Sequence, residues 1–207
     1  MGSLRMDELK PGAEEKIKSA ARELFHRKGY AGTKSRDIAN AAGINVAMLN
    51  YYFRSKQKLF DLIMLESLQH FLSSMSDVFN DEKTDLDTKI RVMIGNYIDL
   101  LIDQPDIPLF IMTELRAHPT DLIHKMGAKD LLMRSFFFRQ LQERLQKSKS
   151  SAVHPLHFLM NIMGMTIFPF ISSPMLKNLG NMSDKNYTEM MIERKKLIPL
   201  WVKNMLR

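Results

Sequence analysis

The chain of 207 residues is long enough to bury a substantial core without disulfides or structural metals. It contains no cysteine, which excludes a thiol nucleophile, a disulfide framework and a cysteine-based zinc site, and which fits a cytoplasmic location. The net charge of +7 is concentrated at the start: residues 1–56 hold 11 Lys and Arg against 6 Asp and Glu, whereas residues 57–207 hold 19 against 17. Such an excess is expected where a protein meets phosphates, although a solvated basic face explains the charge alone equally well.

Apolar residues recur with helical spacing in almost every long segment, which predicts an all-α fold. The first helix carries one apolar stripe and should end at Lys28-Gly29, with a cation in its last turn and a glycine just beyond. The stripe of the first helix consists of Ile17, Ala20, Ala21, Leu24 and Phe25.

No apolar stretch of the sequence reaches the roughly 18 residues of a membrane span, so no membrane association is expected.

Two short helices and their caps follow. Ser35 is expected to cap the second helix, which Gly43 stops, and Asn45 to cap a third helix over residues 45–52. Ser55 then caps a fourth helix. Two short helices joined at a glycine form a helix-turn-helix, in which the second helix enters the major groove of DNA.

The remaining residues predict a larger helical body. The apolar stripe of residues 90–101 ends before Pro105, and Pro108 lies in the next segment, which continues to Glu114. We expect one long helix from about Thr120 to Lys147, and another from Pro155 that breaks near Pro169. A loop with one short turn at most should cover residues 172–186, before a last helix with a kink at Pro199.

The segment from Gly29 to Phe60, GYAGTKSRDIANAAGINVAMLNYYFRSKQKLF, resembles the signature of TetR/AcrR family transcriptional regulators. This resemblance implies a three-helix DNA-binding domain over residues 13–57, after a tail of residues 1–12. It further implies a helical ligand-binding and dimerisation domain over residues 58–207. The matching positions are Gly29, Thr33, Ile38, Ala39, Ala42, Gly43, Leu49, Tyr51, Phe53, Lys56 and Leu59.

The resemblance also assigns the DNA contacts. Arg36 is expected to reach a base edge, because the guanidinium fork pairs bidentately with guanine, although an exposed ion pair would also explain it. Lys56 is expected to contact a phosphate at a helix N-terminus, and Thr33 either contacts a phosphate or caps the helix. The family often has Gly at the position of Ala47 and Tyr at that of Asn50, so the operator sequence stays open. The full predicted set is Thr33, Lys34, Ser35, Arg36, Asn45, Val46, Ala47, Met48, Asn50, Tyr51, Tyr52 and Lys56.

The resemblance further implies a homodimer that reads a palindromic operator and responds to a small hydrophobic effector. The 17 methionines suit either an adaptable apolar pocket or ordinary core packing. The candidate effector-binding residues are Met93, Tyr97, Phe110, Glu114, Met133, Phe137, Asn161 and Met163, with Arg116 as a further polar candidate. The candidate dimer-interface residues are Phe158, Ile162, Leu197, Ile198 and Trp201, which would otherwise belong to the core of one subunit.

Other functions find less support in the sequence. Four histidines, His118, His124, His154 and His157, lack the companion ligands that a metal site would need, so no metal or other cofactor is expected. No nucleophile–base set and no glycine-rich phosphate loop point to an enzyme. The function predicted is therefore a repressor released from its operator by a ligand, and the alternative is a helical lipid carrier or enzyme that works through the apolar body.

Overall fold

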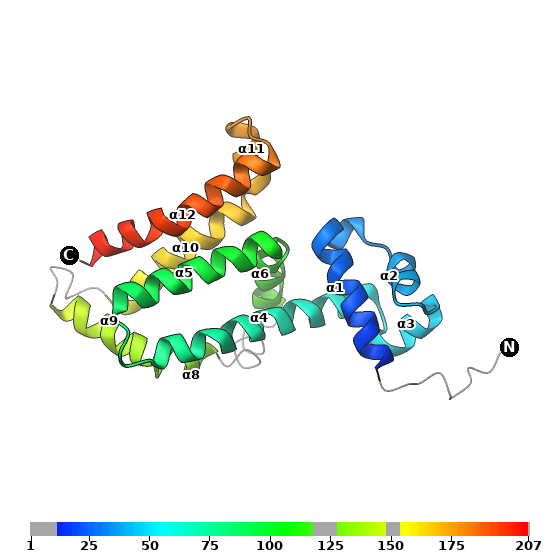
Figure 1. Ribbon diagram of the computed structural model, residues 1–207, viewed down its shortest axis with the longest axis horizontal. Coiled ribbons are helices and arrows are strands. Elements are labelled where there is room, and N and C mark those ends of the chain that lie inside the picture. Colours follow the sequence, from blue (N-terminus) through cyan, green and yellow to red (C-terminus); the bar gives the residue numbers. More distant parts are fainter. Residues whose placement is uncertain (1–11, 118–127, 148–153, 207) are drawn as a thin grey trace. The chain divides into compact units, whose positions relative to one another are not determined.

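The computed structural model describes residues 12–117, 128–147 and 154–206, and these ranges contain helices and no strand (Figure 1). The all-α fold predicted from the sequence is confirmed. The chain divides into two compact units, Met1–Ser67 and Leu68–Arg207. The expected domain boundary after residue 57 stays a prediction, because helix α4 (Lys56–Asn80) runs through both units without a break.

The first unit is built from α1 (Ala13–Gly32), α2 (Ser35–Ala41), α3 (Val46–Phe53) and the beginning of α4. The backbone of α1 leaves the helical region at Gly29, whose φ is 67°, as the predicted stop at that glycine requires. The apolar faces of the four helices form one core, which consists of Ile17, Ala21, Leu24, Phe25, Ile38, Ala39, Leu49, Phe53, Leu59, Phe60 and Ile63.

Ion pairs join α1 to α4 within this unit. Glu66 on α4 accepts hydrogen bonds from Lys18 at 3.0 Å and from Arg22 at 2.8 Å. Hydrogen bonds to Glu15 and Glu66 raise the pKa of Lys18, so this ammonium remains charged at neutral pH. These contacts hold the first half of α4 against α1.

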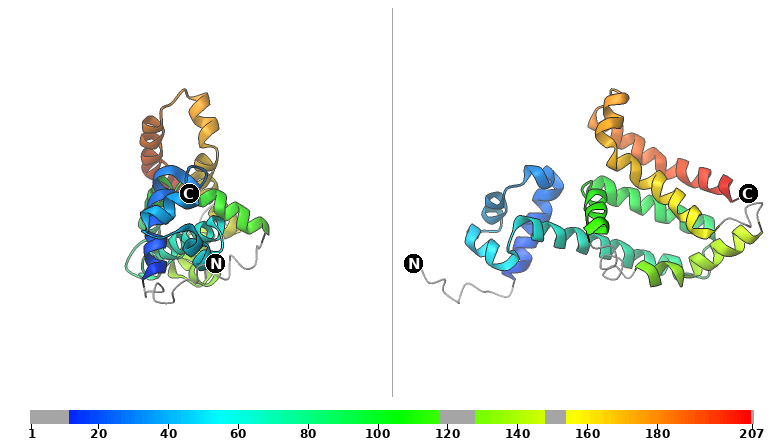
Figure 2. Two further views of the ribbon diagram at one scale, coloured as in Figure 1. Left: turned by 90° about the vertical axis from the view of Figure 1, so that its right-hand side faces the viewer. Right: turned by 180° about the vertical axis from the view of Figure 1, so that it is seen from behind.

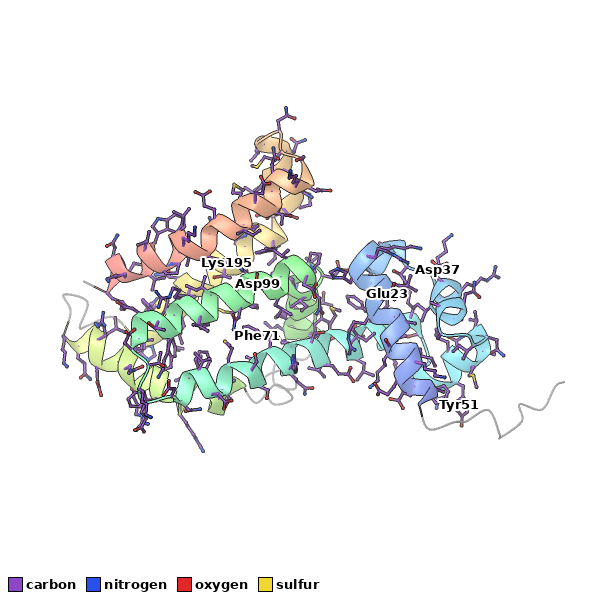
Figure 3. The ribbon with its side chains drawn as sticks, viewed as in Figure 1. Glu23, Asp37, Tyr51, Phe71, Asp99 and Lys195 are labelled. Carbon is purple, nitrogen blue, oxygen red and sulfur yellow. The ribbon has the colours of Figure 1, made fainter. Side chains whose placement is uncertain are left out.

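The second unit holds the rest of α4 together with the further helices, from α5 to α12, that the structure describes. In it, α10 and α12 lie side by side, α11 connects them, and α5 packs against both α10 and α12 (Figures 1 and 2). Lys195 on α12 pairs with Asp99 on α5, and the two side chains face each other in Figure 3. The helices are α5 (Leu86–Asp103), α6 (Ile107–Ala117), α8 (Ala128–Met133), α9 (Phe136–Gln146), α10 (Pro155–Ile171), α11 (Ser173–Leu179) and α12 (Asp184–Met205).

The core of the second unit contains one fully buried cation. Lys89 on α5 donates a hydrogen bond to the carbonyl oxygen of Phe79 at 3.3 Å, near the C-terminus of α4. Its ammonium also lies 4.6 Å from the centre of the Phe136 ring. Burial lowers the pKa of Lys89, while the hydrogen bond and the ring partly compensate for the lost hydration.

Three expectations about the helices were wrong. The predicted helix from Thr120 to Lys147 is interrupted, because the Ser135 hydroxyl accepts a hydrogen bond from the Phe138 N–H at 3.1 Å and starts α9. Residues 172–186 are not a loop, since they contain α11 and the start of α12. The break expected at Pro169 does not occur, and α10 continues to Ile171.

Candidate nucleic-acid interface and apolar cavity

The turn between α2 and α3 has the geometry of a helix-turn-helix. Gly43 adopts a φ of 69°, which L-residues with a side chain rarely adopt, and the N–H of Ile44 returns to the Ala39 carbonyl at 2.9 Å. The Asn45 side chain accepts a hydrogen bond from the Met48 N–H at 2.8 Å. The predictions that Gly43 stops α2 and that Asn45 caps α3 are confirmed.

One face of α3 is exposed to solvent. Leu49 and Phe53 are buried in the core of the unit, whereas Ala47, Asn50 and Tyr51 are exposed on the opposite side. Tyr51, labelled in Figure 3, is 56% exposed. Three other predicted contact residues are half-buried at the edges of this face, namely Val46, Met48 and Tyr52.

The start of α2 presents two cations to solvent. Lys34 and Arg36 are exposed, while Ser35 is half-buried. The sequence suggested that Ser35 caps α2, but this prediction is wrong, because Ser35 is the first helical residue and Lys34 is the N-cap. The Lys34 N–H donates to the Asp37 carboxylate at 3.2 Å. Asp37 also lies 3.9 Å from the ammonium of Lys28.

The structure gives Thr33 and Lys56 partners within the protein; it contradicts the phosphate contact for Thr33, whereas that for Lys56 stays a prediction. Thr33 is fully buried, and its hydroxyl lies within hydrogen-bond distance of the carbonyl oxygens of Gly29 at 2.8 Å and Leu24 at 3.2 Å, so this side chain cannot reach a phosphate. The Lys56 ammonium donates to the carbonyl oxygens of Tyr30 at 2.9 Å and Thr33 at 2.8 Å. It also lies 3.9 Å from the centre of the Tyr30 ring. Two of its three N–H groups therefore hold the end of α1 in place.

Arg54 is an exposed cation that the sequence reading left out of the contact set. It follows the last residue of α3 and has a φ of 67°. Its position is seven residues after Ala47, three after Tyr51 and four after Asn50. Helical spacing from these predicted contacts was the signal that would have included it.

The second unit contains an apolar cavity of about 270 Å³. On one wall, the Phe71 ring of α4, labelled in Figure 3, stacks on the Tyr97 ring of α5, and the ring centres lie 5.0 Å apart. The other walls come from α6, α8 and α10. The lining residues are Leu68, Phe71, Leu72, Met75, Phe79, Met93, Ile94, Tyr97, Ile111, Leu115, Leu131, Leu132, Leu159, Ile162, Met163 and Thr166.

Of the eight predicted effector-binding residues, Met93, Tyr97 and Met163 lie on this cavity wall. The other five lie elsewhere: Phe110 and Phe137 are buried in the core, where Phe137 stacks on Phe79, Glu114 is half-buried, and Met133 and Asn161 are exposed. Arg116 is also exposed. The sequence reading missed the contribution of α4, although Leu68, Phe71, Leu72, Met75 and Phe79 have the spacing of one helix face.

The predicted dimer residues differ in accessibility. Phe158 and Ile162 are each 4% exposed and Ile198 is 0% exposed, so they belong to the core of one subunit and cannot meet a partner. Leu197 is half-buried and Trp201 is 40% exposed. The exposed apolar side chains on α10 and α12 are Leu156, Met160, Met163, Phe168, Ile192, Leu200 and Trp201.

The histidines and the apolar helices of the described residues indicate no further site. The ring nitrogen Nδ1 of His154 accepts a hydrogen bond from the Leu156 N–H at 3.2 Å and caps α10, while His118 and His124 lie outside the described residues. Residues 12–117, 128–147 and 154–206 contain no group of three potential metal ligands. Within the same ranges no single helix could span a membrane, although α10 and α11, bent by 72°, together pass by length and composition.

Comparisons with known proteins agree with this geometry. Residues 17–63 match the family model for bacterial regulatory proteins of the tetR family. The Probable HTH-type transcriptional regulator YttP of Bacillus subtilis is 22% identical over 203 residues, which cover 96% of each chain.

Two solved structures have the same fold. A transcriptional regulator of the TetR/AcrR family from Thermobifida fusca superposes with a TM-score of 0.61 at 16% identity, over 88% of this chain and 95% of the other. The regulator FadR of Bacillus subtilis, solved in complex with stearoyl-CoA, gives 0.53 at 20% identity, over 87% and 96%. The family match identifies residues 17–63 as a DNA-binding domain of the tetR family, and together with the full-length relative and the helix-turn-helix geometry it supports a TetR/AcrR family transcriptional regulator.

Proposed function

We propose that the protein is a homodimeric repressor that leaves a palindromic operator when a small hydrophobic molecule fills the cavity. The observation that carries this proposal is the continuity of α4. Its first turn is hydrogen-bonded to the end of α1 through Lys56, and its later residues Leu68, Phe71, Leu72, Met75 and Phe79 form a wall of the cavity. A ligand that displaces this wall acts on the same helix whose first turn is bonded to α1.

The DNA half of the proposal assigns α3 to the major groove. Its exposed residues Ala47, Asn50 and Tyr51 face the bases and the adjacent backbone, and Arg36 at the start of α2 reads a base edge. Lys34 and Arg54 contact phosphates. A DNA-binding role of this kind also places the protein in the cytoplasm, with the chromosome.

The effector half rests on the chemistry of the cavity wall. Its residues are almost all aliphatic or aromatic, which favours a ligand held by burial of apolar surface. FadR of Bacillus subtilis, which shares the fold, was solved with stearoyl-CoA, a molecule with a long apolar chain. The role proposed is binding, not catalysis.

The dimer half rests on the exposed faces of α10 and α12. Met160, Phe168, Leu200 and Trp201 are between 40% and 58% exposed, which is a liability for a monomer. A twofold pairing of these helices would cover them and would supply the two recognition helices that a palindrome needs.

The test is selection of bound duplexes from a random pool, followed by sequencing. The expected product is a palindrome whose half-sites lie one helical turn or a multiple apart.

The selected duplex is then titrated with the variants Arg36→Ala and Lys34→Ala. The control is Lys185→Ala on α12, because the side chain of Lys185 is 84% exposed. Arg36→Ala should reduce discrimination at one base pair, by about 1–3 kcal/mol. Lys34→Ala should weaken all duplexes alike and lower the salt slope by about one.

The proposal fails if no sequence is enriched at low salt, both from protein as purified and from protein unfolded and refolded to remove bound ligand. Equal effects of Arg36→Ala and Lys34→Ala on the selected and the random duplex would contradict the division between base and phosphate contacts. An aliphatic ligand that binds the protein without changing its affinity for the selected duplex would contradict release by the effector.

A further inference from the structure

The cavity wall carries few polar side-chain groups. Among the described lining residues, only Tyr97 and Thr166 have a side-chain oxygen, and none carries a charge. The Thr166 hydroxyl is already used, because it donates to the Ile162 carbonyl in its own helix at 2.8 Å. Tyr97 is therefore the side chain that decides which polar group a ligand can bring into the cavity.

The hydroxyl of Tyr97 lacks a hydrogen-bond partner among the described residues. Its side chain is 7% exposed, and its ring is held by stacking on Phe71. Within the same residues, the side-chain polar atoms that are both enclosed and unpartnered are the Oε1 atoms of Gln104 and Gln140, and the Tyr97 oxygen is not among them. The Tyr97 hydroxyl is therefore not enclosed, and its side chain lines the cavity. A ligand that fills the cavity removes this hydroxyl from water, so a ligand that offers an acceptor in place of water binds more tightly than one that does not.

The same surroundings disfavour an anionic ligand. A carboxylate buried among these side chains would lose its hydration, and none of the described lining residues carries a cation to replace it. The buried ammonium of Lys89 does not line the cavity and is already bonded to the Phe79 carbonyl. Burial raises the pKa of the Tyr97 hydroxyl, which stays protonated and can donate a hydrogen bond. The group that suits this donor is a neutral oxygen acceptor on an apolar chain.

We infer that the effector of this protein is an uncharged aliphatic molecule whose carbonyl or ether oxygen accepts a hydrogen bond from Tyr97. This inference rests on the proposed effector role of the cavity. It goes further, because it excludes free carboxylates, such as ionised fatty acids, as effectors. It also assigns the recognition of the ligand's oxygen to the hydroxyl of Tyr97.

The experiment compares heptane, 2-heptanone and heptanoate as competitors of a fluorescent apolar dye bound to the full-length protein. At pH 7.5 we expect 2-heptanone to bind at least ten-fold more tightly than heptanoate. Lowering the pH towards the carboxyl pKa of about 4–5 should reduce this difference, because the acid becomes neutral. Tyr97→Phe should weaken 2-heptanone about five-fold, the loss of one neutral hydrogen bond, and should leave heptane unchanged.

Tyr187→Phe is the matched control. The Tyr187 hydroxyl is also buried, but it donates to the Pro169 carbonyl at 2.6 Å and does not line the cavity. This variant should leave the affinities of all three competitors unchanged. Thermal unfolding of each variant shows whether its fold is intact.

The outcomes separate this inference from the proposed function. If none of the three molecules displaces the dye, the cavity is not an effector site. The part of the proposed function in which a small hydrophobic molecule releases the protein from DNA is then overturned. If heptane and 2-heptanone bind but Tyr97→Phe weakens them equally, only the role of Tyr97 is overturned. If heptanoate binds most tightly at pH 7.5, the selection for a neutral ligand is overturned.

Discussion

Two polar residues that the family motif suggested as phosphate contacts hold the backbone between α1 and α2. The backbone of α1 leaves the helical region at Gly29, and the helix ends at Gly32. The hydroxyl of Thr33 lies within hydrogen-bond distance of the Leu24 and Gly29 carbonyls, and the ammonium of Lys56 bonds to the carbonyls of Tyr30 and Thr33. At the residue scale, these bonds determine where α2 begins and therefore where its exposed cations lie.

We predict that Lys56→Met destabilises the first unit without a direct loss of a DNA contact. Methionine keeps the aliphatic stem but leaves the carbonyls of Tyr30 and Thr33 without their donor. The cost should be about 2–3 kcal/mol, from charge-assisted hydrogen bonds and the contact with the Tyr30 ring. Chemical denaturation followed by circular dichroism measures it.

Lys58→Met is the control for this substitution, because Lys58 is exposed on the same turn of α4. It should change the free energy of unfolding by less than about 0.5 kcal/mol. If the two variants are equally stable and Lys56→Met loses affinity for every duplex, Lys56 acts as the phosphate contact that the sequence suggested.

At the scale of elements, α10 shows how a proline can lie inside a continuous helix. Pro169 has no N–H, so the carbonyl of Met165, four residues earlier, loses its helical partner. Arg194 of α12 donates to this carbonyl at 2.7 Å. The Tyr187 hydroxyl, from the same helix, donates to the carbonyl of Pro169 itself. The break expected from the proline is absent because the neighbouring helix supplies the missing donors.

We predict that the effect of replacing Arg194 depends on Pro169. Arg194→Leu should destabilise the protein by about 1–3 kcal/mol, because it leaves the Met165 carbonyl half-buried without a donor. In a Pro169→Ala background the N–H of residue 169 can bond to that carbonyl, so the same substitution should cost less. Denaturation of the four proteins of this double-mutant cycle measures the difference. Equal costs in both backgrounds would mean that Arg194 stabilises through other contacts, such as the Trp201 ring 5.4 Å away.

At the scale of the whole molecule, the proposed dimer depends on the exposed apolar side chains of α10 and α12. We predict that Met160→Glu combined with Leu200→Glu converts this proposed dimer into a monomer. Both residues are more than half exposed, so an acid costs little in a monomer, whereas a paired interface would bury these charges. Light scattering should give a mass near 24.1 kDa for the variant and twice that for the unchanged protein.

Leu109→Glu on α6 is the control for this pair, since Leu109 is 56% exposed and lies outside α10 and α12. It should leave the mass of the protein unchanged. A monomeric variant should also lose most of its affinity for the selected palindrome and retain weak binding to a half-site. An unchanged protein that is monomeric throughout would contradict the proposed dimer.

Local signals allowed much of this protein to be predicted from its sequence. The glycines at positions 29 and 43 and the caps at Asn45 and Ser55 act through backbone geometry and nearby hydrogen bonds, so the sequence shows their role directly. Their spacing predicted the helix-turn-helix, and the resemblance of residues 29–60 to a family signature indicated the family. The position of the recognition helix follows from the same local rules.

Tertiary packing decided the rest. Helical spacing cannot distinguish a side chain that lines a cavity from one that fills the core, which is why Phe137 was expected beside Met93 and Tyr97. Nor can it show that Ile198 faces its own subunit, or that the partner of Lys56 is a pair of carbonyls. These outcomes depend on which helices meet, and that is determined by contacts between residues distant in the chain. The family and the fold were therefore predicted from the sequence, whereas the cavity and its unpartnered hydroxyl were found only in the assembled helices.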